Sequence, residues 1–293
     1  MKFKYFKFIL IIIILILLTF SPVPAAENQE PENPEKGILL VTFGTTFAEA
    51  RAAFKNIEEA ASRAFPDTSV RWAYTSEMIR EKMADNGEQA DSPARALEKM
   101  DREGFGRVAV QSLHTIAGYE FHDLVKTVRK FENSAENIKK TTISGPLLDG
   151  PESMEKAAHA IRKSVPAERK PGEAVVLLGH GTHHPANSAY AALMWRLQTE
   201  DENMFIGTVE GYPGPETILE QLDKNKVSSA WLMPFMSVAG DHARNDMAGD
   251  GKDSWKTLLS KAGIASRPVM KGFAEYEPFV DIWIGQLKEA IEK

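Results

Sequence analysis

The chain has 293 residues, 43% of them hydrophobic and 26% charged, an ordinary globular composition with enough length for a sizeable core. Its formal net charge of −6 argues against nonspecific nucleic-acid binding, which needs a basic surface. It contains no cysteine, which excludes disulfides, thiolate metal ligands and a lipid-modified cysteine anchor.

The first 25 residues differ in character from the rest. Three lysines precede a nearly unbroken apolar run over residues 8–20, and Val23 and Ala25 supply small residues at the −3 and −1 positions of a cleavage site. This pattern indicates a signal peptide, and the run is short for a transmembrane helix; an uncleaved anchor is the alternative. We expect an exported, periplasmic protein, cleaved near Ala25 and without stable membrane insertion. Because the segment carries three lysines and no acidic residue, the mature charge becomes −9.

Residues 26–36 are acidic and rich in proline, a composition that favours a disordered leader. The rest of the chain divides into two halves, residues 37–150 and 151–293, that repeat one order of apolar runs. The matching pairs are 37–46 with 174–183, 70–75 with 205–210, 108–118 with 231–240, and 142–147 with 267–272. Each half is therefore predicted to have about four strands.

Amphipathic helices are expected between the strands, because apolar residues recur there at a spacing near 3.6. The expected ranges are 48–64, 93–103, 120–133, 154–164, 187–199, 215–223, 255–262 and 278–292. This alternation predicts an α/β protein of two similar halves, each a roughly four-stranded parallel sheet with helices on both faces, and an active cleft between the halves. A central first strand gives the order 2-1-3-4.

In the second half, three polar residues directly follow or lie just beyond predicted strands: His180, Glu210 and His242. The carboxyl ends of parallel strands meet at the edge where open α/β sheets bind ligands, and neighbouring strands lie about 5 Å apart. We therefore predict that the three side chains gather. Two imidazoles and one carboxylate form a borderline metal site with room for an exchangeable ligand.

The predicted triad exists in one half only. The equivalent first-half positions are Phe43, Thr75 and roughly Glu120. A packing role should recur in both halves, whereas a binding site need not. A rival metal site would instead combine the neighbouring histidines His180, His183 and His184.

Five ordered motifs resemble the class II tetrapyrrole chelatases, and most closely the anaerobic cobalt chelatases that act on sirohydrochlorin. They are Phe43-Gly-Thr-Thr46, Ser112-Leu-His-Thr-Ile-Ala-Gly118, Gly179-His-Gly-Thr-His183, Val209-Glu-Gly-Tyr-Pro213 and Ala239-Gly-Asp-His-Ala-Arg-Asn-Asp-Met-Ala-Gly-Asp250. The resemblance covers nearly all of residues 37–290. It departs from the family in the signal peptide, because corrin synthesis is normally cytoplasmic.

The resemblance implies a lyase-class enzyme of cobalamin biosynthesis that inserts Co²⁺ into sirohydrochlorin, with Ni²⁺ or Fe²⁺ as other metals. It maps the metal ligands onto His180, Glu210 and His242. Backbone N–H groups at 44–46 and 181–182, near expected helix starts, suit the carboxylates of the substrate. The expected substrate-binding residues are Thr45, Thr46, Arg51, His114 and Arg244, with Lys252 as a further cation. The oligomeric state stays open, including a homo-oligomer.

Two other functions fit parts of the pattern. An exported tetrapyrrole, haem or metal carrier without turnover would fit the signal peptide, and a spare histidine such as His122 would then ligate a haem iron. A zinc hydrolase could use the same triad, but the chain has no H-E-x-x-H motif and no dedicated general base.

Overall fold

The computed structural model describes residues 35–292, so the expected signal peptide and most of the leader lie outside the described residues. The first strand begins at Glu35, so the last two residues assigned to the leader belong to the folded body. Residues from Glu35 onward form one compact unit. Within residues 35–292, every helix is too short or too polar to cross a bilayer.

Each half contains one four-stranded parallel sheet, and both sheets have the same strand order. The first, β2-β1-β3-β4, consists of β1 (Glu35–Thr42), β2 (Ser69–Tyr74), β3 (Phe105–Ser112) and β4 (Lys140–Ile143). The second, β6-β5-β7-β8, consists of β5 (Ala174–Gly179), β6 (Met204–Thr208), β7 (Ser229–Pro234) and β8 (Ala265–Pro268). The predicted order 2-1-3-4 is confirmed in both halves.

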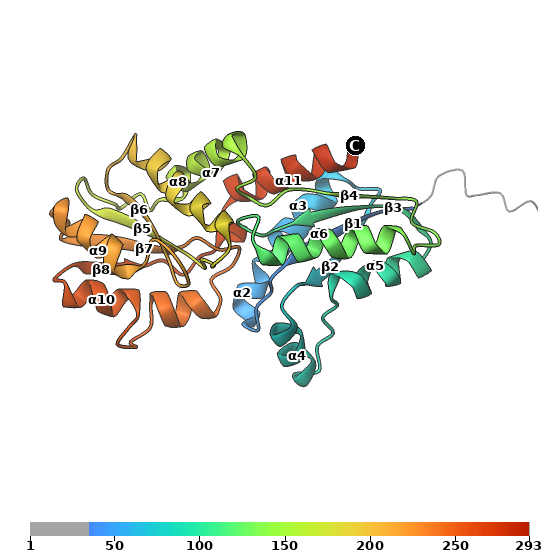
Figure 1. Ribbon diagram of the computed structural model, residues 1–293, viewed down its shortest axis with the longest axis horizontal. Coiled ribbons are helices and arrows are strands. Elements are labelled where there is room, and N and C mark those ends of the chain that lie inside the picture. Colours follow the sequence, from blue (N-terminus) through green and yellow to red (C-terminus); the bar gives the residue numbers. More distant parts are fainter. Residues whose placement is uncertain (1–34, 293) are drawn as a thin grey trace, which may run out of the picture. The chain divides into compact units, whose positions relative to one another are not determined.

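Both faces of the sheets are covered, as near-continuous apolar strands require. In β1, Ile38 and Leu40 enter one hydrophobic cluster while Leu39 and Val41 enter another on the opposite face. The helices (Figure 1) are α2 (Ala48–Ala52), α3 (Phe54–Ala64), α4 (Glu77–Asp85), α5 (Pro93–Arg102), α6 (Tyr119–Glu132), α7 (Pro151–Ser164), α8 (Ser188–Gln198), α9 (Pro215–Lys224), α10 (Trp255–Lys261) and α11 (Glu277–Glu292). Three short turns, η1 (Pro185–Asn187), η2 (Ala243–Met247) and η3 (Phe273–Glu275), complete the elements.

Two helical details differ from the sequence prediction. The helix expected over 48–64 is two helices, α2 and α3, which meet at Ala53. Helix α4 was not predicted, because its residues are mostly polar and only Met83 is buried. Its first turn is capped by a serine, a residue type common at helix starts, because the Ser76 side chain accepts a hydrogen bond from the Ile79 N–H.

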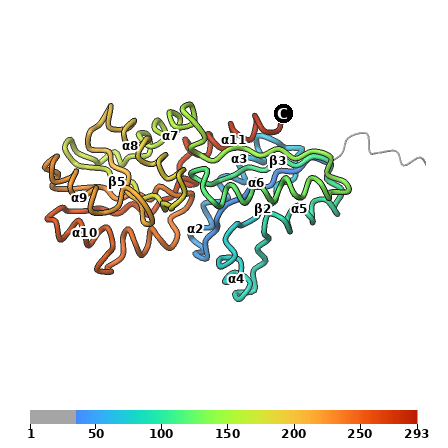
Figure 2. Tube along the Cα trace, in the orientation of Figure 1, coloured from blue at the N-terminus to red at the C-terminus, as the bar shows by residue number. Residues whose placement is uncertain are grey.

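The last helix, α11, packs against the first half although its residues belong to the second half of the sequence. It contacts β3, β4 and α3, and also α7, the helix that links the halves (Figures 1 and 2). The larger hydrophobic cluster accordingly runs through both halves, from Ile38 and Ala109 to Val176 and Trp283. The halves therefore share one core.

We predict that Trp283→Ala lowers the free energy of unfolding by about 3–5 kcal/mol, because the indole is fully buried at this shared core and its loss leaves a cavity. Denaturant unfolding measures this. The matched control is Trp195→Ala on α8, where the side chain is 70% exposed and the change should stay within about 0.5 kcal/mol. Equal effects of the two substitutions would contradict the packing assigned to α11.

Candidate metal site at the strand ends

The second sheet brings His180 and Glu210 together through its register. Strand β5 is central, with Gly179 opposite Thr208 of β6 and Leu178 opposite Pro234 of β7. The β5–β6 ladder continues past the strand ends, because the Val209 N–H donates to the Gly179 carbonyl (3.0 Å) and the Glu210 N–H donates to the His180 carbonyl (2.7 Å). The backbones of the two predicted ligands therefore lie side by side.

Glycines on both sides of His180 leave room for neighbouring groups to pack closely. A Cβ on Gly179 would lie 2.5 Å from the Tyr190 ring. Gly181 has a φ of +81°, and a Cβ there would lie 2.1 Å from the Glu210 carbonyl oxygen. Any larger residue at Gly181 would be strained and would push the Glu210 backbone away from His180.

The two imidazoles lie against each other, with ring centroids 4.5 Å apart and planes at 88°. His180 Nδ1 lies 3.0 Å from the Gly181 carbonyl oxygen, and His242 Nδ1 lies 2.6 Å from Asp246 Oδ2. A carbonyl or an ionised carboxylate can only accept, so each Nδ1 carries the proton. In the neutral ring the lone pair then lies on Nε2, and that is the nitrogen available to bind a metal.

Glu210 does not complete a three-ligand set in this conformation. Glu210 is exposed. Within residues 35–292, no three His, Asp or Glu side chains lie close enough together to hold a metal ion. The rival set of His180, His183 and His184 is not assembled either. His183 is exposed, and His184 Nδ1 accepts a hydrogen bond from the Ala186 N–H at 3.1 Å.

The first half meets this edge with an aromatic ring and a hydroxyl. The Phe43 ring, at the position equivalent to His180, lies 6.0 Å from the His180 ring. Thr45 is buried, and its Oγ1 would lie 3.1 Å from a Cβ on Gly240. Thr46, in the same turn, is half-buried. The first half therefore places Phe43 beside His180 and Thr45 beside the segment that leads to His242.

The two predicted substrate-binding arginines are already paired with carboxylates. Arg51 donates to Glu88 at 2.9 Å, and within the described residues its buried Nη1 lacks a partner. Arg244 reaches across to the first half, where it donates to Glu49 at 2.7 Å and lies 4.7 Å over the Phe47 ring. A substrate carboxylate that binds either guanidinium would compete with a carboxylate of the protein. Lys252 is exposed and lies 3.8 Å from Asp253.

The backbone N–H groups expected to bind anions are partly occupied. The Thr182 N–H donates to Asn187 Oδ1 at 3.0 Å, because residues 181–184 form a turn before η1 and do not lead directly into a helix. In the first half, the Phe47 N–H donates to Thr45 Oγ1 at 3.2 Å. Side chains within these two turns therefore accept hydrogen bonds from backbone N–H groups in the regions where the sequence pattern predicted anion binding.

His114 is held by two hydroxyls of the first half. Its Nδ1 lies 2.9 Å from Ser112 Oγ, and its Nε2 lies 3.4 Å from Thr75 Oγ1. Desolvation by the surrounding protein lowers the pKa of His114 to about 4, so the ring is neutral near pH 7. A neutral ring with both nitrogens near hydroxyls suits a polar contact to a substrate better than proton uptake.

Two side-chain contacts near this edge were not predicted. The first joins His242 to Asp246, which lies four residues further along the chain. His184 lies between Tyr119 and His122 of α6, with ring centroids at 4.8 and 5.1 Å, so the two halves also meet there. The spacing of the histidines in the sequence does not predict this contact, because the contact joins residues of separate halves. These contacts give no support to a haem at His122.

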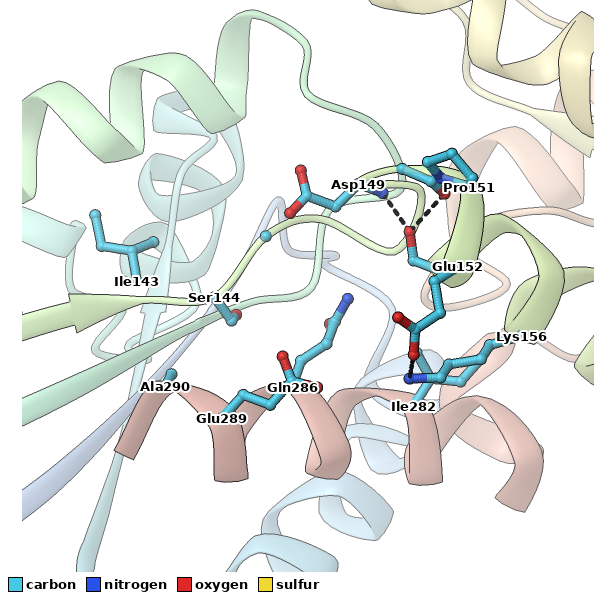
Figure 3. A pocket seen from close by; sticks show the side chains of 13 residues that line it. Ile143, Ser144, Asp149, Pro151, Glu152, Lys156, Ile282, Gln286, Glu289 and Ala290 are labelled. Carbon is cyan, nitrogen blue, oxygen red and sulfur yellow. Dashed lines mark hydrogen bonds and ion pairs between the residues drawn. The ribbon is translucent and has the colours of Figure 1, made fainter. Parts of the chain in front are cut away.

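A cavity of about 380 Å³ lies elsewhere, between β4, the start of α7 and α11 (Figure 3). Its lining includes Asp149, Glu152, Lys156, Gln286 and Glu289, and none of the predicted site residues. Glu152 and Lys156 pair with each other at 2.8 Å. The cavity therefore belongs to the junction around α7 and α11 and is separate from the two imidazoles.

We predict that stability falls as the pH drops from about 6.5 to about 4, because His114 binds its proton more readily in the unfolded chain than in the fold. The loss from this residue reaches about 3 kcal/mol, at 1.36 kcal/mol per pH unit of pKa difference. Denaturant unfolding at several pH values measures it. His114→Gln should flatten the decline, whereas His159→Gln on the exposed face of α7 should leave it unchanged. Identical slopes for His114→Gln and the unsubstituted protein would contradict the assignment.

The family model "Cobalt chelatase (CbiK)" matches residues 36–292. A relative from Nitratidesulfovibrio vulgaris, named sirohydrochlorin cobaltochelatase CbiKC, is 42% identical over 257 residues, which cover 88% of this chain and 91% of the relative. A sirohydrochlorin cobaltochelatase from Salmonella typhimurium is 34% identical over 261 residues, which cover 88% and 97%.

Solved structures share the fold at low identity. The sirohydrochlorin chelatase SirB of Bacillus subtilis subspecies spizizenii, in complex with cobalt, has a TM-score of 0.58 at 14% identity and covers 88% of this chain and 96% of its own. CbiX, the terminal enzyme for siroheme biosynthesis in denitrifying bacteria, has a TM-score of 0.55 at 15% identity and covers 87% and 99%. These likenesses support the arrangement of two similar α/β halves.

Proposed function

The chain belongs to the CbiK family of cobalt chelatases, and from this premise we propose that it is an enzyme that inserts Co²⁺ into sirohydrochlorin. The observation that carries the proposal is the pair of imidazoles at the strand ends. Their rings lie 4.5 Å apart, and each has its Nδ1 engaged, which leaves Nε2 as the nitrogen for a metal.

We assign the Co²⁺ ligands to His180 and His242 through Nε2, and to Glu210 through its carboxylate. The Glu210 backbone is fixed beside His180, and its side chain is exposed, so rotation about the side-chain torsions brings the carboxylate to the ion. A site of nitrogen and oxygen ligands holds Co²⁺ without the closed thiolate cage that would retain it. Ni²⁺ and Fe²⁺ are accepted by the same ligands.

Metal insertion has three requirements: the ion is held and partly stripped of water, two pyrrole protons leave, and the macrocycle bends so that a nitrogen lone pair points at the ion. Binding energy from contacts remote from the ion offsets the cost of bending. We assign one pyrrole proton to Glu210 or to one of the two histidines as the metal leaves it, and the other proton to solvent water.

The carboxylates of sirohydrochlorin need cationic partners on an acidic protein. We assign Arg51 and Arg244 to this role, with Thr45, Thr46 and His114 as polar contacts from the first half. Both guanidiniums are paired in this conformation, with Glu88 and Glu49, so substrate binding exchanges one carboxylate partner for another. A neutral porphyrinoid has no carboxylate for this exchange.

The proposed place of action is the periplasm, on the strength of the signal-peptide pattern in residues 1–25. Sequencing the N-terminus of the mature protein, purified from the periplasmic fraction, tests this. A first residue at or near Ala26 supports export, and an intact Met1 in the cytoplasmic fraction contradicts it.

We predict that His180→Ala and His242→Ala each lower the rate of cobalt insertion by more than about 100-fold, since loss of a ligand should exceed the 10–100-fold effect of losing an outer partner. The absorbance change of sirohydrochlorin upon addition of Co²⁺ measures the rate. His159→Ala, at an exposed position on α7, is the control and should retain full activity. Stoichiometric binding of sirohydrochlorin without turnover by the unsubstituted protein would contradict the proposed function.

A further inference from the structure

The two imidazoles at the strand ends are oriented by different kinds of partner. His180 is held by the main-chain carbonyl of Gly181, which every variant retains. His242 is held by a side chain, the carboxylate of Asp246, at 2.6 Å. Removal of that carboxylate would leave His242 without its Nδ1 partner while the rest of the site stays in place.

The turn that holds Asp246 is fixed from two sides. His242 precedes the π-helical turn η2, and Asp246 lies within it. Ala243 and Met247 of this turn are fully buried in the core. Arg244, between them, is tied to Glu49 of the first half at 2.7 Å. The carboxylate is thus carried on an anchored segment, in one of the π-turns that are often found at functional sites.

We propose that Asp246 is a positioning residue for the metal: its carboxylate keeps the proton of His242 on Nδ1 and aims Nε2 at the ion. This inference rests on the proposed function, because it takes His242 as a Co²⁺ ligand. Metal-ligating histidines commonly donate their other ring N–H to a carboxylate or a backbone carbonyl, which fixes the tautomer and the ring orientation. In this chain the two histidines use one partner of each kind.

The test compares Asp246→Asn with Asp241→Asn in the full-length mature protein, with Co²⁺ alone as the probe. Asp241 precedes His242 directly and contacts Asn245 at 3.0 Å, so its substitution removes the same charge from the same turn but not the bond to Nδ1. The amide that Asp246→Asn introduces can accept from Nδ1–H or donate to Nδ1, so it no longer enforces the Nδ1–H tautomer, and the Nε2–H tautomer, which lacks the ligand lone pair, becomes populated. We expect a dissociation constant for Co²⁺ that is about 10–100-fold higher in Asp246→Asn and unchanged in Asp241→Asn.

A second readout separates positioning from a purely structural role. Long-range ¹H–¹⁵N spectra of the metal-free protein report which ring nitrogen of His242 carries the proton. The unsubstituted protein and Asp241→Asn should show the Nδ1–H form, and Asp246→Asn should shift toward Nε2–H. Asp246→Glu keeps a carboxylate and should retain most of the Co²⁺ affinity. This variant tests the proposal even if Asp246→Asn folds poorly.

The results distinguish a failure of the Asp246 inference from a failure of the proposed function. If Asp246→Asn binds Co²⁺ as tightly as Asp241→Asn, or if Asp246→Glu is as weak as Asp246→Asn, the positioning role is overturned. If His180→Ala also binds Co²⁺ as tightly as the unsubstituted protein, the metal site itself is misplaced and the proposed function fails with it. Loss of affinity in His180→Ala with none in Asp246→Asn removes only the inference about Asp246.

Discussion

The candidate metal site depends on one constraint, the hydrogen-bonded ladder that continues past β5 and β6 to join His180 and Glu210. That ladder requires Gly181, whose absent side chain leaves room for the Glu210 carbonyl. The same register sets the end of β7 at the level of Leu178, from which the chain leads to His242. Parallel pairing, a glycine and two strand ends thus determine where the candidate ligands lie.

The duplicated fold divides the chemistry between its halves. The second half supplies both imidazoles and the Glu210 backbone at its strand ends. The first half has an apolar ring, Phe43, at the position equivalent to His180, and its His114 is kept neutral by burial and held by two hydroxyls. The proposed metal ligands therefore all come from the second half, and the core shared through α11 packs the first half against it.

The sequence was sufficient to predict the two sheets, their strand order and the proximity of His180 to His242, because apolar runs and parallel topology determine where strands end. It did not predict that α11 packs on the first sheet, since an amphipathic pattern shows which face is buried but not which sheet covers it. The pairs Arg244–Glu49 and His242–Asp246 also depend on tertiary structure and on the π-turn. The Glu210 side chain is exposed, so the packing of the fold does little to fix its torsions.

The most direct test of the metal site is anomalous diffraction at the cobalt edge, from crystals of the mature protein equilibrated with Co²⁺. We predict one strong peak about 2.1 Å from Nε2 of both His180 and His242, with the Glu210 carboxylate turned toward it. A peak beside His122 and His184 with none between His180 and His242 would contradict the proposed metal site.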